Sequence, residues 1–267
     1  MGINSKIVLT MLLAVSAGTR AQLVQPAPRV EDYPDPLEAD QRKILAQITD
    51  HAMKYSSELP DFTCEEITRH NVDQKGTGQY WRLTDTVSGE LSYSGHKGVH
   101  KVLKVNGKEE TGDRHPRAAF NSPDVFGGLL TWIFDPKSKT SFKWNSWSAL
   151  EKRRTYVFAY TVAQENSQFA VTKAREPLGF YGNIYADAET GQIIRINLVG
   201  QTPAKATLRD VSFDVDYALT KIGDKEYPLP AKANLRLRDA KILIWDEIEF
   251  HHYRQFGAAD EQFSKRP

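Results

Sequence analysis

The chain contains a single cysteine, Cys64, among its 267 residues. An internal disulfide is therefore excluded, and so are zinc sites built from paired cysteines. A chain of this length buries enough apolar surface to fold without such cross-links. Glu65 and Glu66 follow the thiol directly, and neighbouring carboxylates raise a thiol pKa and make it a poorer nucleophile. We therefore expect Cys64 to be structural.

Short motifs for metal, phosphate or nucleophile chemistry are missing as well. The sequence has no HExxH, EF-hand loop, Gly-x-Ser-x-Gly elbow, P-loop or dinucleotide fingerprint. His96 and His100 would stand about 13 Å apart in a strand, and His251 and His252 would point to opposite faces. We interpret all four as surface histidines and expect no metal and no cofactor. A catalytic site assembled only in space would leave no such motif.

The sequence also lacks an excess of charge of one sign. It holds 35 Lys and Arg against 34 Asp and Glu, and the loss of residues 1–21 would remove Lys6 and Arg20. The remaining chain would then carry a net charge of about −1. Nucleic-acid-binding domains usually show a strong basic excess, so no nucleic-acid partner is expected.

No apolar run is long enough to span a bilayer, which takes roughly 20 residues. Residues 7–17 instead have the length of the apolar part of a secretory signal peptide, and Thr19-Arg20-Ala21 supplies small residues before a cut at Gln22. A buried N-terminal helix is the alternative. We predict that residues 1–21 are removed, that no integral membrane segment remains, and that the protein is periplasmic or extracellular.

The pattern of the remaining chain changes along its length. Residues 22–39 are rich in proline and predict an extended leader. Residues 40–256 are expected to form one domain, followed by a flexible tail over residues 257–267. Helical spacing over residues 40–58, ended by Pro60, predicts a single amphipathic helix.

From residue 62 onward, apolar and polar residues alternate with a period of two, which is typical of half-buried antiparallel strands. In residues 80–93, the alternation places Trp81, Leu83, Val87 and Leu91 on one face. Similar stretches are residues 156–162, 211–219, 231–238 and 242–254.

Turn signals join neighbouring strands of this pattern. Asn106-Gly107 is a two-residue hairpin signal, residues 187–191 end in a glycine suited to a longer hairpin loop, and Gly223-Asp224 is a third turn. Such local connections favour a meander. The predicted fold class is mainly β (α+β): a curled antiparallel meander forming an incomplete barrel over a few helices.

A second helix is predicted over residues 123–134, because Ser122-Pro123-Asp124 is a strong helix start. It is apolar nearly all round, so we expect it to be covered on more than one side. It either covers the mouth of the barrel or is a plain core helix. We interpret Gly127-Gly128 inside it as a site of close packing or a kink.

The candidate ligand-binding residues are apolar side chains expected to face the inside of the barrel or to lie on this helix. They are Trp81, Leu83, Val87, Leu91, Phe126, Leu130, Trp132, Tyr156, Phe158, Tyr160, Phe213 and Tyr217. Trp144 and Trp147 are either a hydrophobic rim or core, or a sugar-stacking platform. Asp214 and Asp216 are either solvated surface or a glycosidase-like acid pair.

One hairpin carries a family resemblance. Residues 184–196, IYADAETGQIIRI, resemble the hairpin "strand, Asp, turn, Thr-Gly, strand" of the lipoprotein-carrier superfamily, which includes LolA-like, LolB-like and RseB-type domains. The resemblance implies an incomplete antiparallel barrel closed by helices over an apolar cavity. Residues 57–64, 144–147 and 153–158 are similar to a family of uncharacterised secreted bacterial proteins, which implies no particular activity.

Three functions follow as hypotheses. The first is a non-enzymatic binding protein that holds a lipid, an acyl chain or a lipidated peptide in an apolar cavity. The second is an interaction or sensor domain whose partner is another envelope protein. The third is a hydrolase whose site is visible only in space. A sizeable apolar cavity favours the first, and a filled core with an exposed apolar patch favours the second.

Overall fold

The computed structural model describes residues 33–110, 125–170, 177–203 and 206–256. The predicted signal peptide, most of the leader and the predicted tail lie outside these residues. Eleven strands form one antiparallel sheet that is not closed into a barrel, in the order β4-β3-β2-β1-β11-β10-β9-β8-β7-β6-β5. The predicted fold class is confirmed.

The elements follow one another along the chain with short connections. The helices are α1 (Glu38–Glu58) and α2 (Gly128–Phe134), with 3₁₀ turns at Pro136–Ser138 and Gln164–Asn166. The strands are β1 (Phe62–Asp73), β2 (Arg82–Ser94), β3 (Lys97–Val105), β4 (Lys108–Glu109), β5 (Ser141–Leu150), β6 (Arg153–Val162), β7 (Gly179–Asp187), β8 (Ile193–Gln201), β9 (Leu208–Ile222), β10 (Lys225–Asp239) and β11 (Ile242–Gln255).

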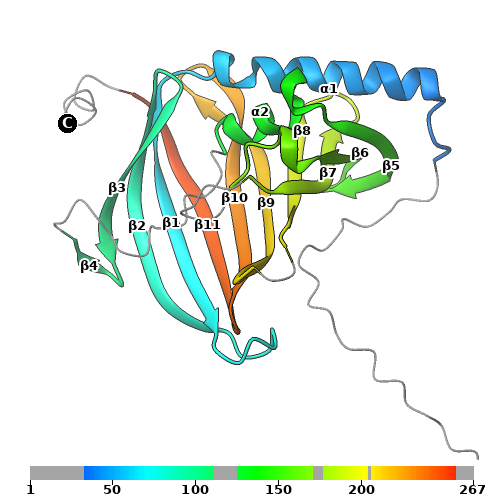
Figure 1. The fold of residues 1–267 in the computed structure, drawn as a ribbon. Helices are drawn as coiled ribbons and strands as arrows, with labels where there is room; N and C mark the ends of the chain where they lie inside the picture. Colours follow the sequence, from blue (N-terminus) through cyan, green and yellow to red (C-terminus); the bar gives the residue numbers. More distant parts are fainter. Residues whose placement is uncertain (1–32, 111–124, 171–176, 204–205, 257–267) are drawn as a thin grey trace, which may run out of the picture.

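The sheet consists of two meanders joined at one seam. Strands β1 to β4 are consecutive neighbours, and so are β5 to β11. The seam pairs β1 with β11 from Phe62↔Gln255 to Asp73↔Leu243. The sheet curls around α2, and α1 lies across one end of the curl (Figure 1).

The predicted hairpin turns are confirmed. Asn106 and Gly107, between β3 and β4, have φ values of 52° and 78°, which is the left-handed backbone that this turn type requires. Gly191, between β7 and β8, has φ 71°, and Gly223, between β9 and β10, has φ 60°.

The single apolar face predicted for residues 80–93 is wrong in part. His70 pairs with Asp85, but the next residue of β1, Asn71, pairs with Leu83, so Thr84 forms a bulge on β2. A one-residue slip moves every following side chain to the other face of the sheet. Val87 and Leu91 therefore lie on the concave face, whereas Trp81 and Leu83 lie on the convex face.

The second predicted helix is shorter than expected. Its predicted start at Ser122-Pro123-Asp124 lies outside the described residues, Val125 and Phe126 belong to a turn, and α2 begins only at Gly128. Four of its seven residues, Leu129, Leu130, Ile133 and Phe134, are buried. The first predicted helix is confirmed as α1, which buries Ile48, Ala52 and Tyr55.

Among the described residues, neither helix combines the length and the apolar character that crossing a membrane would need.

Candidate binding site at the mouth of the half-barrel

A small cavity lies where α1 crosses the end of the curled sheet. It has a volume of about 80 Å³ and is partly open to solvent. Its walls come from the C-terminal half of α1, from Leu130 of α2, and from the ends of β8, β9 and β10. The lining residues are His51, Ala52, Tyr55, Glu58, Leu59, Leu130, Gln192, Ile193, Tyr217, Tyr227 and Pro228. We name this feature the mouth cavity.

The lining of the mouth cavity is apolar with a few polar groups. Leu59, Leu130 and Ile193 are buried members of the main core, so the cavity is continuous with the hydrophobic interior. Tyr55 and Tyr217 meet edge to face, with ring centroids 6.0 Å apart. The Nδ1 atom of His51 is buried and has no hydrogen-bond partner among the described residues. Such a lining can accept an apolar group and offer a hydrogen bond beside it.

Few polar contacts hold α1 against the sheet end. Gln47 Nε2 donates a hydrogen bond to the carbonyl oxygen of Thr190 at 3.2 Å. His96 Nδ1 lies 2.8 Å from the carbonyl oxygen of Ser56. Apolar packing by Ile48 and its neighbours adds to this attachment.

Gly127 allows the turn before α2 to approach α1 closely. Its φ of 146° is unfavourable for residues with a side chain, and a Cβ there would lie 2.7 Å from the Cβ of Ser56. The sequence interpretation of this glycine as a close-packing position is confirmed, although Gly127 precedes the helix instead of lying inside it.

Much of the concave face near the mouth is filled by aromatic side chains. Phe62 stacks on Tyr93 with ring centroids 5.0 Å apart, and Phe126 contacts Phe62 at 5.3 Å and Phe250 at 5.5 Å. These contacts join the β1–β11 seam, β2 and the turn before α2. This part of the interior is a packed core.

The predicted ligand-binding residues divide into four groups. Leu130 and Tyr217 line the mouth cavity. Leu91, Phe126, Phe158, Tyr160 and Phe213 are buried in the main core, and Trp132 and Tyr156 are partly buried against it. Val87 is half-buried on the concave face, and Trp81 and Leu83 lie on the convex face, where Trp81 meets Trp245 edge to face.

Sequence reasoning missed most of the mouth cavity. Tyr55 and Leu59 lie on or next to a helix that was predicted to be amphipathic, and that amphipathic pattern was the available signal. Ile193 and Tyr227 lie near hairpin ends, and nothing in the sequence indicates that these ends meet α1.

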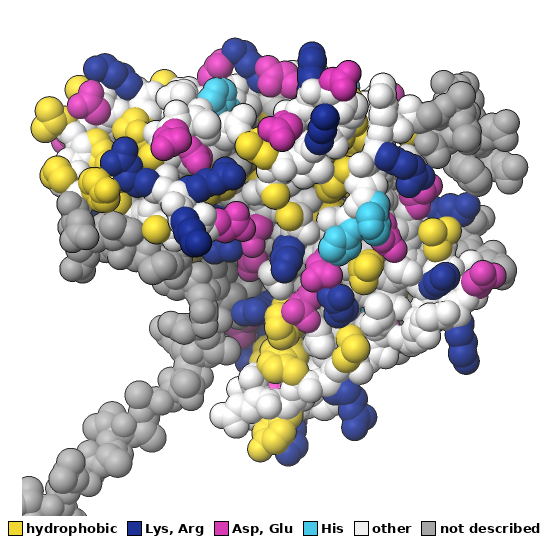
Figure 2. Space-filling view, turned by 180° about the vertical axis from the view of Figure 1, so that it is seen from behind, with side chains coloured by type: hydrophobic (Ala, Val, Ile, Leu, Met, Phe, Trp, Pro, Cys, Tyr) yellow, Lys and Arg dark blue, Asp and Glu magenta, His cyan; other side chains and the backbone are white. Residues whose placement is uncertain are grey.

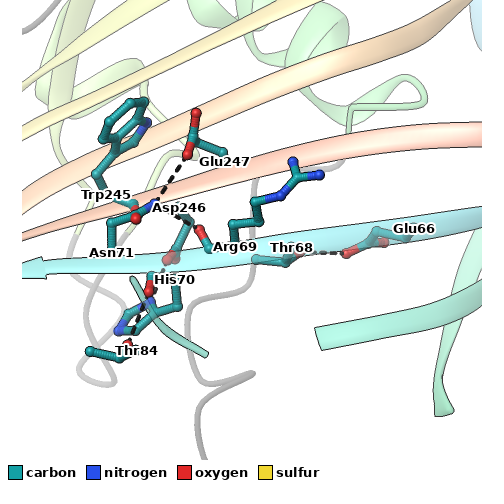
Figure 3. Close-up of polar contacts among 9 residues, drawn as sticks. All are labelled: Glu66, Thr68, Arg69, His70, Asn71, Thr84, Trp245, Asp246 and Glu247. Carbon is teal, nitrogen blue, oxygen red and sulfur yellow. Dashed lines mark hydrogen bonds and ion pairs between the residues drawn. The ribbon is translucent and has the colours of Figure 1, made fainter. Parts of the chain in front are cut away.

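A polar cluster lies lower on the concave face, beyond α2. Because paired residues share a face, Glu66, Thr68 and His70 of β1 face the same way as Phe250, Ile248 and Asp246 of β11. His70 Nδ1 contacts Asp246 Oδ1 on this face. Asn71 donates to Glu247 on the opposite face of the sheet (Figure 3).

This histidine–carboxylate pair has no activated hydroxyl among its described contacts. Thr84 Oγ1 donates to the carbonyl oxygen of His70 at 3.0 Å, and Thr68 Oγ1 donates to Glu66 at 3.4 Å. Neither hydroxyl is directed at the ring of His70, so the geometry does not resemble a nucleophile–base pair. Within the described residues there is also no group of three or more potential metal ligands.

Three of the four histidines predicted to lie on the surface pair with carboxylates. His100 Nδ1 lies 2.8 Å from Glu66, and His252 Nδ1 lies 2.9 Å from Glu65. His251 Nε2 lies 3.4 Å from Glu249. These pairs bridge strands of the sheet or stay within one strand, which agrees with the interpretation as surface residues.

Asp214 and Asp216 are not simply solvated. Asp216 forms an ion pair with Arg195, and Asn234 donates to Asp214 at 2.9 Å. Burial raises the pKa of Asp214, against the hydrogen bond from Asn234, which lowers it. The two carboxylates therefore belong to a polar network on the convex face, where cationic and anionic side chains are interspersed (Figure 2).

Trp147 is not an exposed sugar-stacking platform. Its indole N–H donates to the carbonyl oxygen of Pro34 at 2.9 Å, and the ring of Tyr33 lies 5.8 Å from it. The Arg154 guanidinium stacks on both rings at about 5 Å. Trp144 packs edge to face on Trp147. The pair fixes the end of the leader and forms a hydrophobic rim.

Cys64 is fully buried. Burial, reinforced by Glu66, raises the pKa of its thiol to about 12. A thiol with that pKa is protonated at neutral pH and is a poor nucleophile, which agrees with the structural role predicted for it.

No protein-family model matches the sequence, and none of the curated proteins matches it either. Among solved structures, the fold is similar to that of a LolA superfamily protein from Nitrosomonas europaea, which is 9% identical; the match covers 82% of this chain and 97% of that one, with a TM-score of 0.44. A putative outer membrane lipoprotein-sorting protein domain from Vibrio parahaemolyticus is 10% identical, with coverages of 84% and 97% and a TM-score of 0.39.

The complex of MucA and MucB from Pseudomonas aeruginosa gives a weaker match. It is 12% identical over 82% of this chain and 100% of that one, with a TM-score of 0.24. Each of these matches is a likeness of fold at low sequence identity.

Proposed function

We propose that the protein is a non-enzymatic binding protein that receives an apolar group, such as an acyl chain or the lipidated end of a peptide, at the mouth of the half-barrel. The observation that carries this proposal is the mouth cavity, which is apolar, partly open and continuous with the core. The predicted export signal supports a role in the periplasm or outside the cell.

The polar groups of the cavity suit a ligand with an apolar tail and a polar end. The tail would lie against Leu59, Leu130 and Ile193. The polar end would stay near His51, Glu58 and Gln192, where Nδ1 of His51, which has no partner among the described residues, offers a hydrogen bond. Binding would rest on apolar contact, with a few polar groups fixing the orientation.

The size of the cavity requires α1 to move. Its volume of about 80 Å³ is well below the roughly 300–1,000 Å³ of sites that enclose a drug-sized ligand. The closed form therefore takes only the end of a chain. Among the described residues, apolar packing and a few polar contacts hold α1, so displacement of this helix is the most direct way to admit more.

The first experiment fills the cavity. Titration of the wild type with cis-parinaric acid, which fluoresces in apolar surroundings, should show saturable binding. Ile193→Trp should weaken it at least about tenfold, because the larger ring occupies the space of the ligand. Tyr181→Trp is the matched control, since Tyr181 is 46% exposed on the neighbouring strand. Denaturant midpoints establish that both variants fold. A wild type that does not bind the probe would refute the proposal.

A second experiment locks α1 in place. A Cβ at Gly191 would lie 3.2 Å from Cγ of Gln47, so Gln47→Cys with Gly191→Cys brings two thiols within disulfide reach. The oxidised double variant should lose probe binding and regain it on reduction, while Gln47→Cys alone should bind in both states. Equal binding in the locked and reduced forms would show that α1 does not move.

An interaction or sensor domain is the second candidate. The aromatic packing around Phe62 and Phe126 favours it, because a filled interior leaves less room for a ligand. Absence of probe binding by the wild type would favour this candidate over the first.

A further inference from the structure

Strands β8 and β9 separate inside the sheet before either of them ends. Towards the end of the sheet that α1 crosses, the last pair between them is Arg195↔Asp216. The next residue of β8, Ile194, is skipped in the pairing of β8 with β7 and forms a bulge, and a bulge bends its strand. β9 continues beyond the last pair to Ile222. We name the gap between β8 and residues 217–222 of β9 the β8–β9 fork.

Two prolines of β10 determine which backbone groups of β9 face this fork. Leu219 pairs with Pro228, and Tyr217 pairs with Pro230. Proline has no N–H to exchange, so both pairs occupy the non-hydrogen-bonded positions of the ladder, which alternate with hydrogen-bonded ones. The backbone N–H and C=O groups of Leu219, and of Lys221 two residues further on, therefore point away from β10 into the fork. On this side, no strand or turn of the described chain pairs with either residue, and both residues are exposed.

A second cavity lies in the fork, with a volume of about 150 Å³ and only a partial opening to solvent. Its walls include Leu150 and Arg153 of the β5–β6 hairpin, Ile194 of β8 and residues 216–219 of β9. Consecutive residues of a strand point to opposite faces of the sheet. A cavity lined by four consecutive residues therefore lies along the edge of β9 instead of on one face. We name this feature the fork cavity.

The size and the walls of the fork cavity suit an apolar side chain. A cavity of about 150 Å³ with apolar walls can hold a benzene ring, and Leu150, Ile194 and Leu219 supply apolar walls here. The two arginines of the lining already pair with aspartates, and Glu151 lies in an exposed turn. Apolar contact is therefore the main interaction that the fork cavity offers to a ligand.

We propose that the β8–β9 fork binds an extended peptide segment of a partner protein. The backbone of the segment pairs with Leu219 and Lys221, and one large apolar side chain, phenylalanine or leucine, fills the fork cavity. In strand addition of this kind, the main-chain hydrogen bonds give affinity and the side-chain pocket gives specificity. Tyr217 separates the fork cavity from the mouth cavity, because it lines both. Peptide binding needs no ligand in the mouth cavity, so neither proposal depends on the other.

The first experiment uses the whole protein and a fluorescein-labelled peptide, SVTFTVS, measured by fluorescence anisotropy. The peptide should bind, and the variant SVTSTVS should bind at least about tenfold more weakly, because it buries no ring. Saturating cis-parinaric acid should not displace the peptide. Displacement would place the phenylalanine in the mouth cavity and would overturn the proposal, without affecting the function proposed above.

The second experiment fills the fork cavity. Ala218→Trp should weaken binding of SVTFTVS at least about tenfold, and the smaller change Ala218→Leu should weaken it by less. Ala159→Trp is the matched control, because Ala159 is also half-buried in a strand but lines neither cavity. It should keep the wild-type affinity to within about twofold. Denaturant midpoints establish that the variants fold.

Backbone methylation separates strand addition from simple apolar attraction. Alternate peptide nitrogens of an extended segment point to opposite sides, so two peptides can be made with the same number of methyl groups. Methylation of the set that faces β9 should abolish binding, whereas methylation of the other set should keep the affinity to within about threefold.

Four results would overturn the proposal: no binding of SVTFTVS, equal binding of SVTSTVS, no effect of Ala218→Trp and Ala218→Leu, or equal affinity of the two methylated peptides. Sedimentation adds a fifth. Wild-type dimers that dissociate in Ala218→Trp would assign the fork to a second copy of the chain instead of a partner protein.

Discussion

The two faces of the sheet are stabilised by different interactions, although the same strands supply both. On the concave face, Phe213 of β9 is fully buried in the main core. Its neighbour Asp214 points the other way and accepts a hydrogen bond from Asn234, whose own oxygen accepts the indole N–H of Trp245 at 3.0 Å. One face therefore depends on excluding water, and the other on pairing polar groups in fixed geometry.

This difference shows that the two faces of one sheet can be stabilised in different ways. Around Phe213, apolar contacts dominate the concave face, so substitutions there mainly change packing. On the convex face, charged and polar side chains pair with one another, as Arg195 does with Asp216. Substitutions on each face should therefore differ in size and in the property they change.

The largest loss is expected for Phe213→Ala on the concave face. Removing this ring leaves a cavity in a fully buried site, and such truncations cost about 3–5 kcal/mol of unfolding free energy. Leu219→Ala, on the same strand but 44% exposed, should cost less than about 1 kcal/mol. Urea unfolding of both variants measures the contrast, and equal losses would show that the concave face is not the principal core.

Trp132→Ala tests whether α2 is a core helix or a cover. Trp132 is partly buried against the core, with its ring 5.8 Å from that of Phe169. We expect a loss of about 2–3 kcal/mol, below the range for a fully buried ring, together with altered parinaric acid affinity. Thr131→Ala, at an exposed position of α2, is the control. A stability loss without any change in probe affinity would make α2 a plain core helix.

Asn234→Ala should lower the unfolding free energy less than Phe213→Ala does, and by no more than Trp132→Ala. It leaves the Asp214 carboxylate and the Trp245 N–H without their partner, and the loss of buried hydrogen bonds costs about 1–3 kcal/mol. Asn145→Ala, which removes an exposed side-chain contact with Asn183, should stay within about 0.5 kcal/mol of the wild type. If the two changes prove equal by urea unfolding, the convex network contributes little to stability.

The smallest expected effect is a change of stability with pH, caused by Asp73 in the loop after β1. It is seen only in acid. Burial alone would raise the pKa of Asp73, but hydrogen bonds from the backbone N–H groups of Lys75, Gly78, Tyr80 and Thr77 lower it from 3.8 to about 2. Its stabilising contribution is therefore complete above about pH 4 and is lost as the pH falls towards 2.

Urea midpoints between pH 5 and pH 2 measure this contribution. The wild type should lose stability over that range, and Asp73→Asn should lose less of it, because the amide does not titrate. Parallel curves for the two proteins would show that another carboxylate is responsible.

Local signals made much of the fold predictable. The period of residues 40–58 and the glycine turns, such as Asn106-Gly107, depend on neighbouring residues alone, and they matched the structure. The bulge at Thr84 did not follow from the sequence, because it depends on how β2 pairs with β1. It moved Trp81 and Leu83 to the opposite face.

The candidate site was less predictable than the fold. Apolar strand residues such as Phe158 and Phe213 were correctly expected to face inward, but inward positions in a curled sheet are mostly core. The mouth cavity depends on where α1 crosses the sheet end and on which hairpin ends meet it. That placement depends on the curvature of the whole sheet. No single segment of the sequence determines this curvature.

The seam between β1 and β11 also bears on the order in which the chain folds. Most of the described residues lie between Phe62 and Gln255, which pair at one end of this seam. Closing so long a loop is slow, because chain entropy is lost before the contacts form. β1 leaves the ribosome before its neighbour β11, which is the last described strand. One edge of β1 therefore lacks its β11 partner until all the strands between them have been made, and for that period it is exposed to pairing with other chains.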